Sequence, residues 1–168
     1  MNDQNPRTIA ARVLGRRCGG DYVEHLLDRT LSESRLSGPD RALCQELVYG
    51  VVRWQATLDW LIARKAKDRT QKPVLQNLLR LGLYQIFWLD RIPNHAAVHE
   101  TVELAKQSGL GPKAGFVNAV LRGYLREFDA TKVLLGDLKG SQPHIGYSHP
   151  EWLVARWQER TGDCLTAG

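Results

Sequence analysis

Residues Pro73 to Asp90 read PVLQNLLRLGLYQIFWLD. When this stretch is wound as a helix, apolar side chains cover almost every side of it, and a soluble helix of that kind lies at the centre of other helices. Pro73 suits a first helical turn, and residues 91–93 supply a stop signal. Four polar residues interrupt it: Gln76, Asn77, Arg80 and Gln85. It also falls short of the roughly 20 apolar residues that cross a membrane. We therefore expect the buried axis of a helical domain.

The flanking sequence predicts further amphipathic helices, because apolar residues recur at three- and four-residue spacing. Helix-start signals precede them: Asn5-Pro6, Asp21, Ser37 to Asp40, Asn94, and Gly109 to Pro112. Gly19-Gly20 should end the first helix near Arg17, and a bend near Gln55 should divide the long apolar series that follows Asp40. Residues 64–69 should form a polar connection. No segment shows the two-residue alternation of strands, so we predict an all-α bundle of about seven helices.

The pattern weakens from Asp129 to Ser148, where glycine and proline punctuate the sequence and predict no more than a short helix. His149-Pro150-Glu151 then opens another amphipathic segment, which carries Trp152 and Trp157. We expect a helical domain over residues 1–128, a linker over 129–148, and the start of a lead-in to a further domain over 149–168.

The composition is that of an ordinary globular protein of 168 residues, with 43% hydrophobic and 24% charged residues. A net charge of +5 is compatible with a nucleic-acid partner without requiring one. Three cysteines form no CxxC pair, which disfavours a zinc or thioredoxin-like site: Cys18, Cys44 and Cys164. The N-terminus lacks the pattern of a signal peptide, so we expect a cytoplasmic protein that does not span a membrane.

The arginines of the first helix are one candidate for anion binding. Arg12 and Arg16 are one turn apart, and Arg17 follows directly, so their guanidinium groups can form a patch that bridges phosphates. The alternative is a solvated helix face on which the arginine stems cover the core.

The loop Gly109-Leu110-Gly111-Pro112-Lys113 is a second candidate. Free amides at the start of the next helix could receive a phosphate together with Lys113. No GK[ST] follows at the spacing of a nucleotide-binding loop, so an ordinary turn with a solvated lysine stays open as the alternative.

Asn118, Arg122 and Arg126 are the third candidate, because their four-residue spacing places them on one helix face. Such a row can contact a nucleic-acid backbone. It could equally satisfy neighbouring carboxylates such as Glu103.

His95 and His99 stand four residues apart beside acidic residues, a spacing that can hold a metal. Neither a third ligand nor an HExxH arrangement is evident, which favours capping and packing roles and no metal site. The tryptophans could stack on bases, but most lie in apolar stripes, which favours the core. No glycine-rich strand–turn–helix for S-adenosylmethionine and no GxSxG occurs, so we predict a binding domain.

Four segments resemble the NusB-like RNA-binding domain, in the version found at the N-terminus of Sun/RsmB/Fmu-type 16S rRNA cytosine-5 methyltransferases. They are LRLGLYQIFWLDRIPNHAAVHETVELAK (Leu79–Lys106), GFVNAVLRGYLR (Gly115–Arg126), DRALCQELVYGVVRW (Asp40–Trp54) and YSHPEWLVARWQERTG (Tyr147–Gly162). The fourth resembles the family's lead-in to the methyltransferase domain.

The resemblance implies an all-α domain that docks such an enzyme on small-subunit rRNA. It also implies a following domain that uses S-adenosylmethionine and two catalytic cysteines. None of the three cysteines here matches those positions, so no catalytic or cofactor-binding residue is carried over. In the family the arginine-rich first helix contacts RNA, which carries over to four residues: Arg7, Arg12, Arg16 and Arg17. The implied partners are 16S rRNA, the chain's own methyltransferase domain and a weak homodimer.

Two alternatives come from other functional classes. One is a free-standing NusB-type transcription antitermination factor, which binds a ribosomal protein and a leader RNA. The Tyr147–Gly162 segment disfavours it, because such a factor needs no lead-in to a second domain. The other is a protein–protein scaffold in which the arginines of the first helix bind nothing anionic.

Overall fold

The computed structural model describes residues 5–17, 22–67 and 71–161, and within these ranges the chain forms helices and no strand, which confirms the all-α prediction. Its helices are α1 (Pro6–Arg16), α2 (Val23–Ser32), α3 (Gly38–Arg53), α4 (Gln55–Ala66), α5 (Pro73–Trp88), α6 (Asn94–Ala105), α7 (Gly111–Arg126), α8 (Phe128–Ser141), α9 (Pro143–Gly146) and α10 (Glu151–Thr161). Between α6 and α7 lies η2 (Lys106–Leu110), a kinked connection in which Gly109 leaves the helical conformation.

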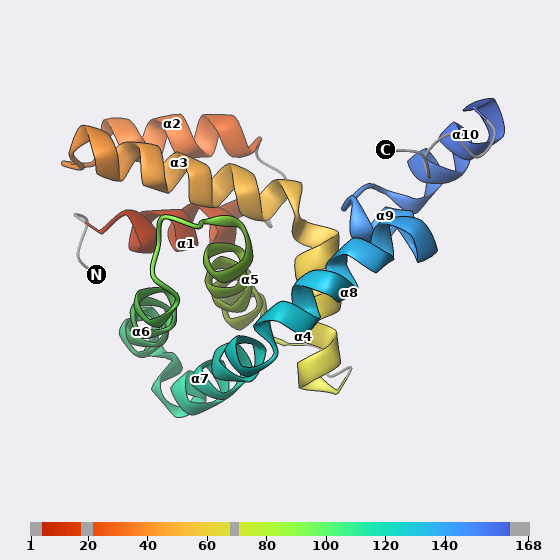
Figure 1. The fold of residues 1–168 in the computed structure, drawn as a ribbon. Coiled ribbons are helices and arrows are strands. Elements are labelled where there is room, and N and C mark those ends of the chain that lie inside the picture. The colour runs from red at the N-terminus through yellow and green to blue at the C-terminus, as the bar shows by residue number, and fades with distance from the viewer. Residues whose placement is uncertain (1–4, 18–21, 68–70, 162–168) are drawn as a thin grey trace.

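Helix α5 is the axis of the bundle, as its sequence predicts. Eleven of its 16 residues are buried, and helices α1, α3, α4, α6 and α7 pack around it (Figure 1). Gly82 of α5 lets α7 approach, since a Cβ there would lie 2.8 Å from Leu121. On the polar side of α5, Arg80 pairs with Asp59 of α4 through two hydrogen bonds of 2.7 Å. These contacts fix α4 and α7 against the same central helix.

Most helices begin where the sequence signals predict. The side chain of Asn5 accepts a hydrogen bond from the amide of Arg7, and Ser37 accepts one from Asp40. Helix α6 does begin at Asn94, but Asn94 is not its cap: the carbonyl of Pro93 accepts from Ala96 and Ala97, and no side chain caps this end. The signals at Asp21 and Gly19-Gly20, and the cysteines Cys18 and Cys164, lie outside the described residues.

The predicted bend near Gln55 is confirmed, because Trp54 leaves the helical conformation between α3 and α4, with φ −102° and ψ 19°. The predicted polar connection over residues 64–69 is wrong at its start. Arg64 and Lys65 belong to the last turn of α4, which ends at Lys67 in the left-handed conformation, with φ 53°. Within this last turn, the guanidinium of Arg64 packs on the ring of Trp60 one turn earlier, 4.9 Å from the centroid.

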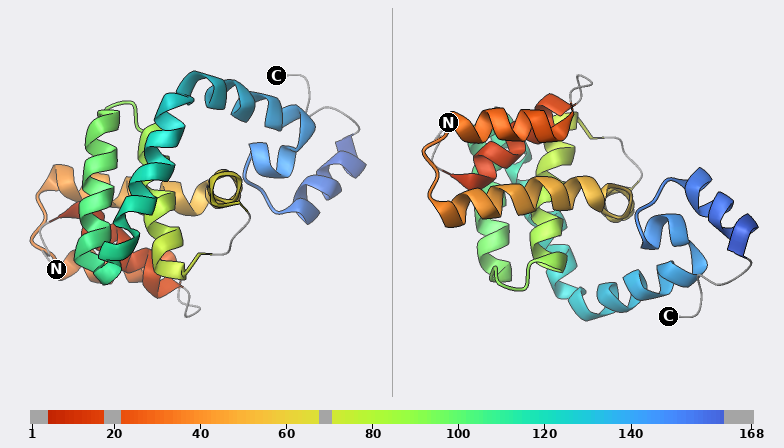
Figure 2. Two further views of the ribbon diagram at one scale, coloured as in Figure 1. Left: turned by 90° about the horizontal axis from the view of Figure 1, so that it is seen from below. Right: turned by 90° about the horizontal axis from the view of Figure 1, so that it is seen from above.

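Helix α8 is longer than the short helix that the sequence predicts. Gly136 and Gly140 do not interrupt it, and it runs away from the bundle toward α9 and α10, as the two views of Figure 2 show. Residues 143–148 then return to the start of α4. There Arg53 donates to the carbonyl of Tyr147 at 2.7 Å, and the amide of Ala56 donates to Ser148 Oγ at 3.0 Å. The division into domain, linker and lead-in stays a prediction.

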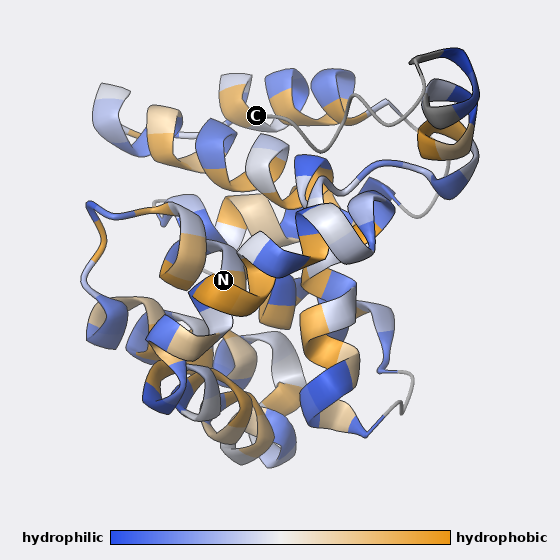
Figure 3. Cartoon of the chain, turned by 45° about the vertical axis from the view of Figure 1, so that its right-hand side comes forward, coloured by the Kyte–Doolittle hydropathy of each residue, from blue (hydrophilic) through white to orange (hydrophobic). Residues whose placement is uncertain are grey.

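Along most of the helices, hydrophobic patches and hydrophilic patches follow one another (Figure 3). This is the pattern of helices that bury one side against a common core. None of the helices in the described part of the chain combines the length and the apolar character needed to cross a membrane.

Candidate nucleic-acid interface

Of the four arginines in α1 and directly after it, two are tied to other helices. Arg7 Nε donates to Gln85 Oε1 of the central helix at 2.7 Å. Burial lowers the pKa of Arg7, although the charges of Glu100 and Asp40 act to raise it. Arg17 Nη1 donates to Gln55 Oε1 at the start of α4, at 2.6 Å. Both guanidinium groups therefore hold helices together.

The other two α1 arginines differ in exposure. Arg12 is half-buried and lies near Cys44 of α3, where its charge lowers the pKa of the thiol against the larger effect of burial. Arg16, in the last turn of α1, is exposed. Of these four arginines, Arg16 is thus the one that faces solvent most fully. Contact between any of them and RNA stays a prediction.

Two residues of the third candidate row, Asn118 and Arg122, line a groove of about 510 Å³ between α6 and α7. Arg122 Nε donates to Asn118 Oδ1 at 2.9 Å, so the four-residue spacing brings these two side chains together on α7. The facing wall includes His95 and His99 of α6 and Lys106 of η2, directly after α6. Imidazole, ammonium and guanidinium donors thereby face one another across the groove.

Glu103 is a carboxylate in this groove, and its ion-pair partner is Lys106. Lys106 Nζ lies 2.6 Å from Glu103 Oε1. The hydrogen bond from Lys106 is the largest cause that lowers the pKa of Glu103, and the charges of Lys106 and His99 act in the same direction. The guanidinium of Arg122 is thus held by Asn118 and its hydrogen bond does not go to Glu103, which was the alternative left open by the sequence.

The α6 wall contains two residues for which the sequence predicted capping and packing and no part in RNA binding. His95 and His99 lie in the groove, and neither caps the helix, because the first turn of α6 has no side-chain cap. Their signal was the four-residue spacing, but only the packing of α6 on α7 reveals what they face. No cluster of three metal-binding side chains occurs among the residues that the structure describes.

Lys113 and Arg126 lie at opposite ends of α7, and both are exposed. Lys113 is in the first turn, next to the chain reversal at Gly109, whose φ is 75°. A positive φ favours glycine, so the turn predicted here has the residue that it requires. Arg126 is in the last turn, beyond the groove.

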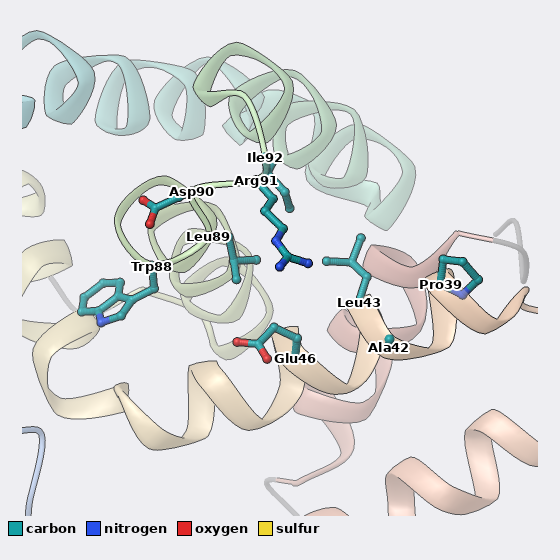
Figure 4. Close-up of a pocket in the computed structure, with 9 residues that line it drawn as sticks. All are labelled: Pro39, Ala42, Leu43, Glu46, Trp88, Leu89, Asp90, Arg91 and Ile92. Carbon is teal, nitrogen blue, oxygen red and sulfur yellow. The ribbon is translucent and has the colours of Figure 1, made fainter.

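A second cavity, of about 630 Å³, lies between α3 and the connection from α5 to α6 (Figure 4). Leu43, Leu89 and Ile92 contribute to an apolar lining, and the side chain of Arg91 extends from the connection toward α3. Glu46 on α3 also lines it. None of the residues predicted from the sequence as RNA-binding lines this cavity, and its lining carries two carboxylates, Glu46 and Asp90, beside the single cation Arg91.

The α6–α7 groove suits an anionic backbone by its chemistry. Its charged and polar side chains are mainly donors, and Glu103 is already paired with Lys106. Arg122 has a planar guanidinium that can give two parallel hydrogen bonds to a phosphate. His95 and His99 add imidazole N–H groups to the lining, and these can donate to an anion.

Comparison with known proteins places the chain in a family and beside named relatives. Residues 4–126 match the NusB family. The chain is 43% identical over 148 residues to "Probable ribosomal RNA small subunit methyltransferase B" of Synechocystis sp., covering 86% of this chain and 33% of the relative. The protein with the same printed name in Bacillus subtilis is 40% identical over 84% of this chain and 32% of its own length. "Ribosomal RNA small subunit methyltransferase B" of Escherichia coli is 40% identical over 76% of this chain and 29% of its own length. The chain thus spans about a third of the length of these curated relatives.

Proposed function

Because the chain belongs to the NusB family, we propose that it is an RNA-binding domain that docks an rRNA-modifying enzyme on small-subunit ribosomal RNA. The relatives with the highest identity given above are named for methylation of that RNA. The domain would bind mainly through phosphates, because phosphate contacts supply most of the affinity and the positioning in nucleic-acid recognition.

The observation that carries this proposal is the α6–α7 groove. Arg122 is held in position by Asn118, so little side-chain freedom would be lost when it binds a phosphate. His95, His99 and Lys106 line the facing wall. Arg16 and Lys113 are exposed elsewhere on the bundle and would add weaker contacts.

The enzyme would be a cytosine-5 methyltransferase that uses S-adenosylmethionine in a separate domain of a longer protein. The described residues of this chain do not fit that cofactor, because they form helices only and lack the strand–turn–helix cradle that holds it. The chain's own part is therefore to bind and orient RNA. Helix α10 would lead to the methyltransferase domain, since Trp152 and Trp157 on α10 are 65% and 37% exposed and would pack against it.

The remaining partners follow from this role. The RNA would be 16S rRNA, and the protein would act in the cytoplasm, where ribosomes assemble. A weak homodimer is also proposed. The division into residues 1–128, 129–148 and 149–168 belongs to the same proposal, with α8 forming most of the linker.

Fluorescence anisotropy with a labelled fragment of 16S rRNA tests the function. We expect the wild-type chain to bind in dilute salt and Arg122→Gln to weaken binding about fivefold, in keeping with about 1 kcal/mol for a phosphate contact. Arg29→Gln is the matched control, because Arg29 is an exposed arginine on α2 with a carboxylate partner, Glu33, at 3.5 Å. Equal effects of the two substitutions, or no binding by the wild type, would contradict the proposal.

A further inference from the structure

Three cations gather around one carboxylate where α4 and α7 end. Lys65 Nζ lies 2.8 Å from both carboxylate oxygens of Glu127. The bond and the charge of Lys65 are the largest causes that lower the pKa of Glu127, and the charges of Arg64 and Arg126 lower it further. Within this group three positive charges face one negative charge, so the positive charge is only partly compensated.

The side chains of Lys65 and Arg126 approach the same point on α7. The position that a Cβ would take at Gly123 is 3.8 Å from Arg126 Nη2 and 3.9 Å from Lys65 Nζ. Both groups are positively charged, so they repel each other. An anion bound between them would relieve that repulsion and gain two attractive contacts.

Aromatic rings hold two of these cations in place. The guanidinium of Arg64 lies over Trp60, 4.9 Å from the ring centroid, and Lys65 Nζ lies 5.1 Å from the centroid of Tyr124. Such contacts restrict long side chains before any ligand arrives, which reduces the entropy lost on binding. The group is therefore prepared for an anion in advance.

The same group continues the row that lines the α6–α7 groove. Arg126 follows Arg122, a residue of the groove, by four positions, so about 6 Å of helix separates the groove from Arg126 and the cations of α4. The sequence predicted residues 64–69 to be a connection, and gave Arg64 and Lys65 no role beyond that of a solvated turn.

We propose that Arg64, Lys65 and Arg126 form a second phosphate-binding site for RNA, in which the Glu127 carboxylate competes with the phosphate. The site rests on the proposed function, because it lengthens the RNA path from the groove along α7 to α4. When a phosphodiester group binds, Lys65 exchanges part of its contact with Glu127 for the phosphate oxygens. Arg64 and Arg126 supply the remaining charge.

Substitutions of opposite direction test this site by anisotropy titration with the same 16S rRNA fragment. Glu127→Gln removes the competing charge, so it should tighten binding about threefold to tenfold and steepen the salt dependence by about one unit. Arg64→Gln with Arg126→Gln should weaken binding about tenfold. Glu33→Gln on α2 is the matched control for Glu127→Gln, because Glu33 is also an exposed carboxylate paired with a cation, Arg29.

A purely structural ion pair gives a different result. In that case Glu127→Gln lowers the melting temperature slightly, because Glu127 is 54% exposed, and leaves RNA affinity unchanged. Unchanged RNA affinity in Glu127→Gln, or an equal gain of affinity in Glu33→Gln, would overturn the second site. The proposed function would stand in either case if Arg122→Gln still weakened RNA binding. Failure of the wild-type chain to bind RNA would instead overturn the proposed function, and the second site with it.

Discussion

Gly50 of α3 lies so close to Tyr84 of α5 that a Cβ at residue 50 would be 1.9 Å from Tyr84 Cζ. The ring of Tyr84 is buried, and its hydroxyl donates a hydrogen bond to Glu46 Oε1 at 2.5 Å. It also stacks on Trp88, with ring centroids 5.8 Å apart. This contact sets how closely α3 crosses the central helix.

Gly50→Ala should therefore destabilise the fold. Because the ring of Tyr84 is held by Glu46 and Trp88, it cannot move aside without losing those contacts. We expect a loss of about 2–3 kcal/mol in the free energy of unfolding, as for other overpacked cores. Urea denaturation followed by circular dichroism measures it.

Gly136→Ala in α8 is the control: no atom lies within 4 Å of its Cβ position, and the substitution should stabilise by about 0.5–1 kcal/mol. A neutral Gly50→Ala would contradict the packing described.

Arg7→Met should lower stability more than it lowers RNA affinity. The side chain of Gln85 is 1% exposed, and without Arg7 its Oε1 loses the hydrogen bond at 2.7 Å. An unsatisfied buried acceptor costs about 1–3 kcal/mol. Thermal unfolding and RNA titration of the same preparations separate the two effects. Arg16→Met, at an exposed position of α1, should lower RNA affinity more than stability, with little change in melting temperature.

The Cys44 thiol should resist alkylation in the folded protein. Its side chain is 0% exposed, and burial is the main cause that raises its pKa from 9.0 to about 11. At pH 8 a thiol with a pKa of about 11 is ionised in roughly one molecule in a thousand, and access is blocked as well. We expect iodoacetamide to modify Cys44 at least about tenfold more slowly in buffer than in denaturant. Peptide mapping by mass spectrometry reads this residue separately, and rapid labelling in buffer would contradict its burial.

The same shift gives stability a defined pH dependence. Because the pKa of Cys44 is higher in the folded state, the folded state binds more protons, and stability falls as the pH rises from about 9 to about 11. Burial likewise raises the pKa of Tyr124 from 10.0 to about 12. The contribution of Tyr124 to stability is therefore lost at higher pH than that of Cys44, as the pH rises from about 10 to about 12. In Cys44→Ala the decline should begin about one pH unit higher. Identical pH curves for wild type and variant would refute this reading.

The central helix could be predicted from the sequence because a helix that is apolar on almost every side is stable only when other helices cover it. Helix α8 could not be predicted at its full length. Gly136 and Gly140 lower the intrinsic helix propensity, and the compensation is tertiary: Thr131 and Leu138 are buried, and residues 143–148 anchor the far end on α4.

The sequence predicted which residues of the candidate site share a face of one helix. It did not predict which residues of a second helix they meet. Four-residue spacing placed Asn118 beside Arg122, and the structure joins them. That His95 and His99 face this pair depends on how α6 packs on α7, which no local pattern contains. The inward hydrogen bond of Arg7 to Gln85 depends in the same way on the crossing of α1 and α5.

The salt dependence of RNA binding tests the central claim most directly. If the groove holds phosphates, the logarithm of the affinity for 16S rRNA should fall linearly with the logarithm of the salt concentration. The slope should decrease by about one unit in Arg122→Gln and stay unchanged in Arg29→Gln. A wild-type affinity that does not change with salt, or a slope that Arg122→Gln leaves unaltered, would contradict phosphate binding in the α6–α7 groove.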